Sequence, residues 1–227
     1  EKSVQYDARR FRWIGRTQDA ARVLVLSNRV SASTLEDFQS REIVVGAVGQ
    51  ASDTAANAYF MNGLFKTRFR VIAGYGASSK AMMAIMSGET QGAFTTWDNI
   101  ATNHKTEWKD GVLRPVLQIG FERQPELPDV PLLLDFARDE RDRQLIRLMS
   151  SSTLMGQSIA APPGLPDELL ETLRRAFDAT VADSGFREKM LAMGAGVNAM
   201  TGEALTDLVS QIMATPPDLI EFYKKLE

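Results

Sequence analysis

Apolar runs and helix-spaced segments alternate through the first half of this sequence. Five apolar runs predict β-strands, at 23–28, 42–49, 69–75, 90–97 and 112–120. Segments with helical spacing separate the middle three runs, at 52–65 and 78–88. Strands that alternate with helices in this rhythm form βαβ units, so we expect an α/β fold with a mainly parallel sheet covered on both faces. Ser33 and Glu36 predict a capping box at the start of a short helix after the first run.

The second half of the sequence has a different character and suggests a second region. Pro125, Pro128 and Pro131 exclude regular structure and indicate an ordered connector. Beyond the connector the chain is rich in predicted helices, at 137–149, from Pro166 onward, at 186–193 and across Leu205–Met213. We therefore divide the chain into a contiguous α/β lobe at 22–148 and a helix-rich lobe built from 1–21 and 149–227.

The composition argues against several classes of function. The net charge is −3 and the 26 basic residues are scattered, so a nucleic-acid partner is not expected. The chain has no cysteine, which removes thiolate nucleophiles and cysteine-ligated metals and mildly favours an exported protein. Its one histidine, His104, lies in a polar stretch and suits a solvated loop better than a catalytic triad or a metal site. No apolar run approaches the roughly 20 residues of a membrane span.

Two strand-to-helix turns carry small and hydroxyl residues, VGQASDT at 48–54 and GYGASS at 74–79. Amide groups at a helix start lack intrahelical partners and carry the positive end of the helix dipole, so such turns suit carboxylate or phosphate groups. Small side chains let a ligand approach the backbone closely. The simpler interpretation is that Ser52 and Ser78 only cap their helices. GYGASS lacks the third glycine of a dinucleotide fingerprint, so no cofactor is expected.

Longer segments resemble a known family. The matching stretches are YDARRFRWIGR at 6–16, GAVGQASDT, IAGYGASSKAMMAIMSGETQGAF, the connector with LPDVP, and the region that begins IAAPPGLPDELLETL. In this order they resemble the substrate-binding receptors of tripartite tricarboxylate transporters, the TctC or Bug type. The resemblance implies a type 2 periplasmic binding protein fold, with two lobes that hold mainly parallel sheets flanked by helices. It also implies a periplasmic, monomeric solute-binding receptor of the Venus flytrap kind, with no catalytic residue and no metal.

The resemblance implies that a small carboxylate is captured between the two lobes and delivered to the permease subunits of a membrane transporter. That ligand would be a di- or tricarboxylate or an aromatic acid. The positions implied for ligand contact are Gly49, Gln50, Ala51, Ser52, Asp53, Thr54, Tyr75, Gly76, Ala77, Ser78, Thr95 and Trp97. Ser52 and Thr54 would cradle one carboxylate with their amides, the second turn would line the cleft wall, and Trp97 would limit the ligand's size. From the residues alone, Trp97 fits stacking on a ligand and closing the lobe equally well.

Two departures from the family pattern affect these expectations. Gln91 stands where the family usually has an acidic residue, so we expect a weakened or altered polar anchor there. Family members also carry a stretch ahead of 6–16 that supplies the first strand and first ligand loop of one lobe. This sequence holds neither that stretch nor a signal peptide. The lobe built from 1–21 and 149–227 is then expected to expose apolar surface and to hold half a cleft.

Two other classes of function stay open at this point. An isomerase or lyase of small acids on the same fold would need a carboxyl group with a raised pKa, either Asp53 or Asp98. Both residues have polar neighbours that suit ordinary capping or surface positions. An effector-sensing domain of a transcription regulator shares the fold and the length, although no helix-turn-helix segment is present. Turnover of a bound acid would indicate the enzyme, and a dimer without a transport partner would indicate the regulator.

Overall fold

The computed structural model describes residues 6–193 and 195–225, which fall into two compact units. Unit 1 consists of the described parts of Glu1–Ala20 and Leu154–Thr215, and unit 2 of those of Ala21–Thr153 and Pro216–Glu227. Within the described residues, no helix combines the length and the apolar character needed to cross a membrane.

Unit 2 is built on a five-stranded sheet with the order β4-β3-β5-β2-β6. Its strands are β2 (Arg22–Ser27), β3 (Ile43–Ala47), β4 (Phe69–Ala73), β5 (Gly92–Thr96) and β6 (Leu113–Ile119). Strand β3 runs parallel to β4 and β5, whereas β2 runs antiparallel to both β5 and β6. The expected α/β class and mainly parallel sheet are confirmed for this unit. Strand β2 is the exception to the parallel arrangement. Its sequence does not show this, because burial on both faces does not reveal a strand's direction.

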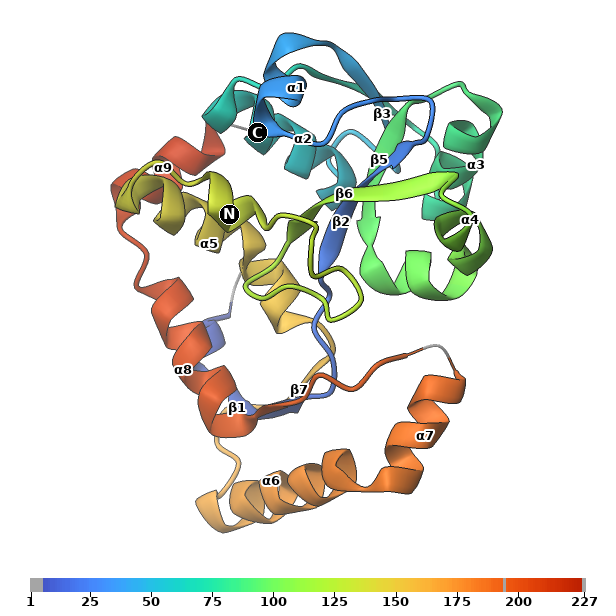
Figure 1. Ribbon diagram of the computed structural model, residues 1–227. Coiled ribbons are helices and arrows are strands. Elements are labelled where there is room, and N and C mark those ends of the chain that lie inside the picture. The colour runs from blue at the N-terminus through green and yellow to red at the C-terminus, as the bar shows by residue number, and fades with distance from the viewer. Residues whose placement is uncertain (1–5, 194, 226–227) are drawn as a thin grey trace. The chain divides into compact units, whose positions relative to one another are not determined.

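Helices cover both faces of this sheet (Figure 1). Alternate side chains of β2 point to opposite faces: Leu24 and Leu26 belong to one core cluster, and Val23 and Val25 to the other. The α-helices of the first cluster are α1 (Leu35–Ser40), α2 (Asp53–Phe65), α5 (Glu140–Met155) and α9 (Pro217–Lys224). Those of the second cluster are α3 (Ser78–Ser87), a π-helical turn (Asn99–Asn103) and α4 (Lys105–Lys109).

Helix α1 (Leu35–Ser40) has its capping box one residue later than the sequence suggested. The N-cap is Thr34, whose hydroxyl accepts from the Asp37 amide, while the Asp37 carboxylate accepts from the Thr34 amide at 3.1 Å. The expected pair of Ser33 and Glu36 was therefore wrong. Both pairs have the spacing of a capping box, and sequence spacing alone does not choose between them.

The proline-rich connector is ordered, as the sequence predicted, although it holds only one 3-10 turn, Leu133–Phe136. The buried side chain of Gln118 explains this order. Its amide nitrogen donates to the carbonyl oxygens of Leu127 at 2.9 Å and Val130 at 2.7 Å, and its oxygen accepts from the Gln124 amide. One interior side chain thus satisfies backbone groups that the prolines keep out of a regular ladder.

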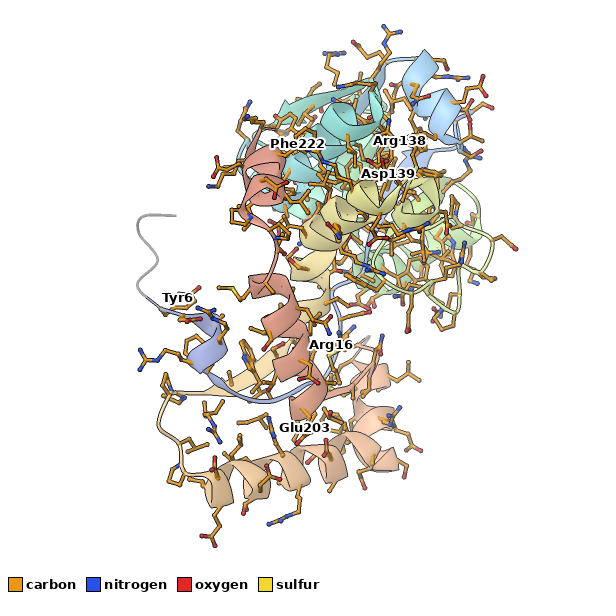
Figure 2. All side chains as sticks on the ribbon, turned by 90° about the vertical axis from the view of Figure 1, so that its left-hand side faces the viewer. Tyr6, Arg16, Arg138, Asp139, Glu203 and Phe222 are labelled. Atoms are coloured by element: carbon orange, nitrogen blue, oxygen red, sulfur yellow. The ribbon has the colours of Figure 1, made fainter. Side chains whose placement is uncertain are left out.

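Helix α9 packs on unit 2, although the sequence division grouped it with 149–227. Pro217 begins this helix at a position where a missing N–H costs nothing. Leu219 is buried in the first core cluster, and the Tyr223 ring lies 5.7 Å from the Phe60 ring. Phe222 also faces this unit, where the Arg141 guanidinium lies 4.6 Å from its ring centre (Figure 2). These apolar contacts hold the end of the described chain in the unit that begins at residue 21.

Unit 1 holds a small antiparallel sheet instead of the parallel sheet expected for both lobes. Its strands are β1 (Arg12–Arg16), β7 (Ser158–Ala161) and β8 (Met200–Thr201), in the order β7-β1-β8. A 3-10 turn (Ala8–Arg10) precedes β1, and the helices are α6 (Asp167–Ala182), α7 (Ser184–Ala192) and α8 (Gly202–Met213). Ile14 packs with Phe177 of α6, and Trp13 packs with Leu205 of α8. Because adjacent residues of β1 point to opposite faces, α6 and α8 cover the two sides of this sheet.

Candidate functional site

The topology of unit 2 places a switch point at the carboxyl ends of β3 and β5. Helix α2 follows β3 on one face of the sheet, and α3 leads from β4 to β5 on the other face. The chain therefore changes direction between β3 and β5, which is where open α/β sheets bind ligands. The pairing of these two strands comprises Val45 with Gly92 and Gly46 with Ala93. Both candidate turns and the end of β5 lie at this edge.

The first turn, 48–54, uses its hydroxyl groups to hold its own shape. The Ser52 hydroxyl donates to the Gly49 carbonyl at 2.6 Å and accepts from the Gly49 amide at 3.2 Å. It also caps α2 and lies 2.8 Å from the Thr54 hydroxyl. The Thr54 hydroxyl in turn accepts from the Val48 amide at 3.1 Å. The capping interpretation of Ser52 is thus confirmed, and both hydroxyls are already engaged.

The second turn is tied to the first through its backbone. The amides of Gly74 and Tyr75 donate to the Ala47 carbonyl at 3.2 and 3.3 Å, and the Gly76 amide donates to the Val48 carbonyl at 2.9 Å. Gly74 and Gly76 have φ values of +114° and +74°, which side chains with a Cβ rarely adopt. These glycines let the chain turn tightly from β4 into α3, and they bring the two turns together.

Helix α3 begins without a side-chain cap. Its N-cap is Ala77, which offers no acceptor, so the expectation that Ser78 caps this helix was wrong. Among the described residues, no acceptor is found for the amides of Ser78, Ser79 and Lys80. These three amides lie at the positive end of a ten-residue helix, and they suit an anion that would serve as the missing cap.

Tyr75 is directed away from this edge. Its ring lies against Gly46 and Ala81 on the sheet face, where a Cβ on Gly46 would come within 3.1 Å of the ring. Its hydroxyl donates to the Glu89 carboxylate at 2.7 Å. Burial, together with that hydrogen bond, raises the pKa of the Tyr75 hydroxyl to about 12. The hydroxyl thus stays protonated and bound to Glu89, which precedes β5 at the opposite edge of the sheet.

The end of β5 contributes mainly to the interior. The Thr95 hydroxyl accepts from the Asn99 side chain at 3.0 Å. The Trp97 side chain belongs to the second core cluster, and the residue is 4% exposed. Its ring meets that of Trp108 edge to face, with the ring centres 4.8 Å apart. Trp97 was expected either to stack on a ligand or to close the lobe by packing. Its burial agrees with packing, because little of the ring is left for a ligand to contact.

Gln91 lies at the amino edge of the sheet, away from both turns. Its side-chain oxygen accepts from the Val44 amide at 2.8 Å, and its own amide donates to the Val44 carbonyl. Its carbonyl accepts from the Ser27 amide. Gln91 extends the strand ladder at the end opposite both turns, which argues against the altered ligand anchor expected there.

Arg22 also lies at the edge of the sheet that carries both turns, although no sequence pattern indicated it. Strand β2 is antiparallel, so its first residue lies beside the last residues of its neighbours, Thr96 and Ile119. Its guanidinium donates to Asp53 at 2.5 Å and to Ser152 of α5 at 3.2 Å. A basic residue directly before an apolar run was visible in the sequence, but the direction of the strand was not.

No protein-family model matches the sequence, and no curated protein matches it either. Solved structures do match. A TctC solute binding protein from Polaromonas, solved without ligand, has a TM-score of 0.74 and 18% identity over 98% of this chain and 71% of its own. MatC from Rhodopseudomonas palustris, solved with bound malate, has a TM-score of 0.59 and 17% identity over 99% and 73%. A third match, from R. palustris and solved with adipate, has a TM-score of 0.62 and 15% identity over 98% and 72%.

The chain has the fold of these solute-binding proteins. The expected likeness to TctC-type receptors is confirmed at the level of the fold, which is what similarity at such identities shows.

Unit 1 also contains a pocket of about 540 Å³, whose charged lining consists of Arg9, Arg10, Arg12, Arg174, Asp167 and Glu171. Arg12 pairs with Asp167, and Arg174 pairs with Glu203 at the start of α8 (Figure 2). Among the described residues, no group of three or more His, Asp or Glu side chains is placed to hold a metal ion.

Proposed function

We propose that this chain is a periplasmic solute-binding receptor for a small carboxylate, which it delivers to the permease of a tripartite tricarboxylate-type transporter. The observation that carries the proposal is the uncapped start of α3 at the carboxyl edge of the sheet in unit 2. Two structural neighbours support a carboxylate, since one was solved with malate and the other with adipate. Delivery to a permease, a monomeric state and a periplasmic location are the parts that come from the resemblance of the sequence segments.

The carboxylate is held by backbone amides more than by hydroxyl groups. The hydroxyls of Ser52 and Thr54 are engaged within the first turn, so they shape the site instead of contacting the ligand. The amides of Ser78, Ser79 and Lys80 have no such engagement. A carboxylate at this helix start gains charge-assisted hydrogen bonds and a favourable dipole without a buried ion pair. Binding of this kind makes or breaks no covalent bond.

A proline at Ser78 tests the amide contact directly. Ser78 is the first helical residue, where proline is tolerated and removes one N–H. The preceding Ala77 has φ −151° and ψ 149°, which a following proline accepts. We expect Ser78→Pro to weaken acid binding roughly tenfold, the cost of one hydrogen bond to a charged group. Ser78→Ala keeps the amide, and we expect this variant to weaken acid binding by less than about threefold.

The assay is isothermal titration of the purified chain with malate, adipate, succinate, citrate and benzoate, followed by NMR of the recovered acid. We expect one acid class to bind and to be recovered unchanged. Loss of affinity in Ser78→Ala equal to that in Ser78→Pro would show that the hydroxyl is the anchor. Chemical conversion of the acid would favour an enzyme over a receptor.

A further inference from the structure

Arg22 and Asp53 form an ion pair whose two partners differ in exposure. The Arg22 side chain is 12% exposed, whereas the Asp53 side chain is 69% exposed. Asp53 is the first residue of α2, so the helix dipole stabilises its carboxylate without any help from arginine. The protein thus covers most of the cation, whereas most of the anion's side chain is exposed to solvent.

The Arg22 guanidinium has donors to spare. It carries five N–H groups in a planar fork that matches a carboxylate. Within the described residues, one nitrogen donates to a single oxygen of Asp53 and another to the Ser152 hydroxyl. A guanidinium with so little exposure needs an anionic partner, because a desolvated charge without one is costly. Asp53 meets that need with one oxygen, where a ligand carboxylate could use two.

We propose that Arg22 binds a carboxylate of the ligand, and that Asp53 occupies Arg22 until the ligand displaces it. This inference rests on the proposed carboxylate-receptor function and adds the residue pair that reads the ligand's charge. An anionic group of the ligand binds the Arg22 guanidinium. The displaced Asp53 carboxylate is then stabilised by the dipole of α2 and by water. A neutral group of the same shape cannot replace Asp53, so Asp53 excludes it from this position. The pair therefore favours a ligand with a second carboxylate beyond the one at the α3 start.

Binding of adipate and malate, and of the monoamide of each, tests this exchange. The monoamide keeps the length of the acid and removes one charge. We expect Arg22→Gln to weaken binding of the diacids roughly tenfold to hundredfold, the range of lost charge-assisted hydrogen bonds, and that of the monoamides less than about threefold. Arg22→Lys keeps the charge without the fork and should lie in between. Asp53→Asn is expected to strengthen diacid binding about threefold to tenfold, because the competing carboxylate is gone.

A second ion pair in unit 2 provides matched controls. Arg70 of β4 and Glu42, the residue before β3, are paired at 2.8 Å. Their side chains are 56% and 52% exposed. Arg70→Gln and Glu42→Gln remove the same charges elsewhere in the unit, and they should leave the affinity within about twofold. A general effect of net charge on binding would instead appear in all four variants.

The outcomes separate this inference from the proposed function. If the wild-type chain binds none of the acids, both are overturned. If it binds them and Arg22→Gln and Asp53→Asn bind equally well, only the inference is overturned, and the ion pair merely holds α2 in place. Weaker diacid binding by Asp53→Asn would also overturn it, because Asp53 would then help to bind the ligand. Circular dichroism and melting of each variant exclude misfolding, and Asp53→Asn carries the test if Arg22→Gln fails to fold.

Discussion

The two serines at the helix starts should respond differently to the same substitution. In Ser52→Ala, α2 loses its N-cap, worth about 1 kcal/mol, and the Gly49 amide and carbonyl lose their hydroxyl partner. We expect the free energy of unfolding to fall by about 1–2 kcal/mol, which for a chain of this length lowers the melting temperature by roughly 2–8 °C. In Ser78→Ala no cap is lost, and alanine is the better helix former, so the change should stay within about 0.5 kcal/mol.

The assay is urea unfolding of both variants and the wild type, followed by circular dichroism with and without a bound acid. Without ligand, only Ser52→Ala should shift the midpoint. A destabilisation by Ser78→Ala equal to that by Ser52→Ala would refute the reasoning, because it would mean that α3 depends on a cap that the structure does not show. An unchanged midpoint in Ser52→Ala would equally contradict the hydrogen bonds of the first turn.

Three further predictions concern packing, charge and the strand ladder. A Cβ on Gly15 would lie 2.2 Å from the Phe177 ring, so Gly15→Ala should destabilise unit 1 by about 1–3 kcal/mol in urea unfolding, and Phe177→Leu added to it should recover part of the loss. The hydrogen bond from Arg138 lowers the pKa of buried Asp142, so this pair stabilises the fold above about pH 4, and its contribution is lost as the pH falls through the lower folded value. The stability difference between wild type and Asp142→Asn should accordingly shrink between pH 6 and pH 2. Gln91→Glu keeps an oxygen for the Val44 amide, so titration should give an unchanged acid affinity.

Local patterns in the sequence predicted the elements of unit 2 well. The runs at 42–49, 69–75 and 90–97 contain β3, β4 and β5, because a buried strand needs apolar residues wherever it lies in the sheet. The direction of a strand and its neighbours in the sheet were harder to predict from the sequence. The orientation of β2 depends on pairing with β5 and β6, which lie about 70 to 90 residues further along the chain. A continuous apolar run is compatible with either direction.

The sequence predicted the cap of α2 but not the caps of α1 and α3. Ser52 caps α2, although Asp53 and Thr54 beside it are residue types that also cap helices. At α1, Ser33 and Thr34 compete, and the fold selects Thr34. At α3, Ser78 is preceded by a glycine-rich turn whose backbone bonds fix where the helix begins, and that point is Ala77. A shift of one residue converts an expected cap into the first helical residue and leaves the helix start open.

The side chains that drew attention in the sequence therefore differ from the groups of the proposed site. Ser52, Thr54 and Trp97 are engaged in the turn or the core, where their hydrogen bonds and packing give the site its shape. The groups that remain are amides, which every residue has, and the Arg22 guanidinium, whose partner Asp53 lies 31 positions away. Neither has a local sequence signature, since an amide is identified by its missing partner and an ion pair by its geometry. A binding site made of such groups can change its ligand through substitutions at Arg22 or Asp53 without altering the turns, so receptors with the same turn sequences are expected to differ in the charge they select.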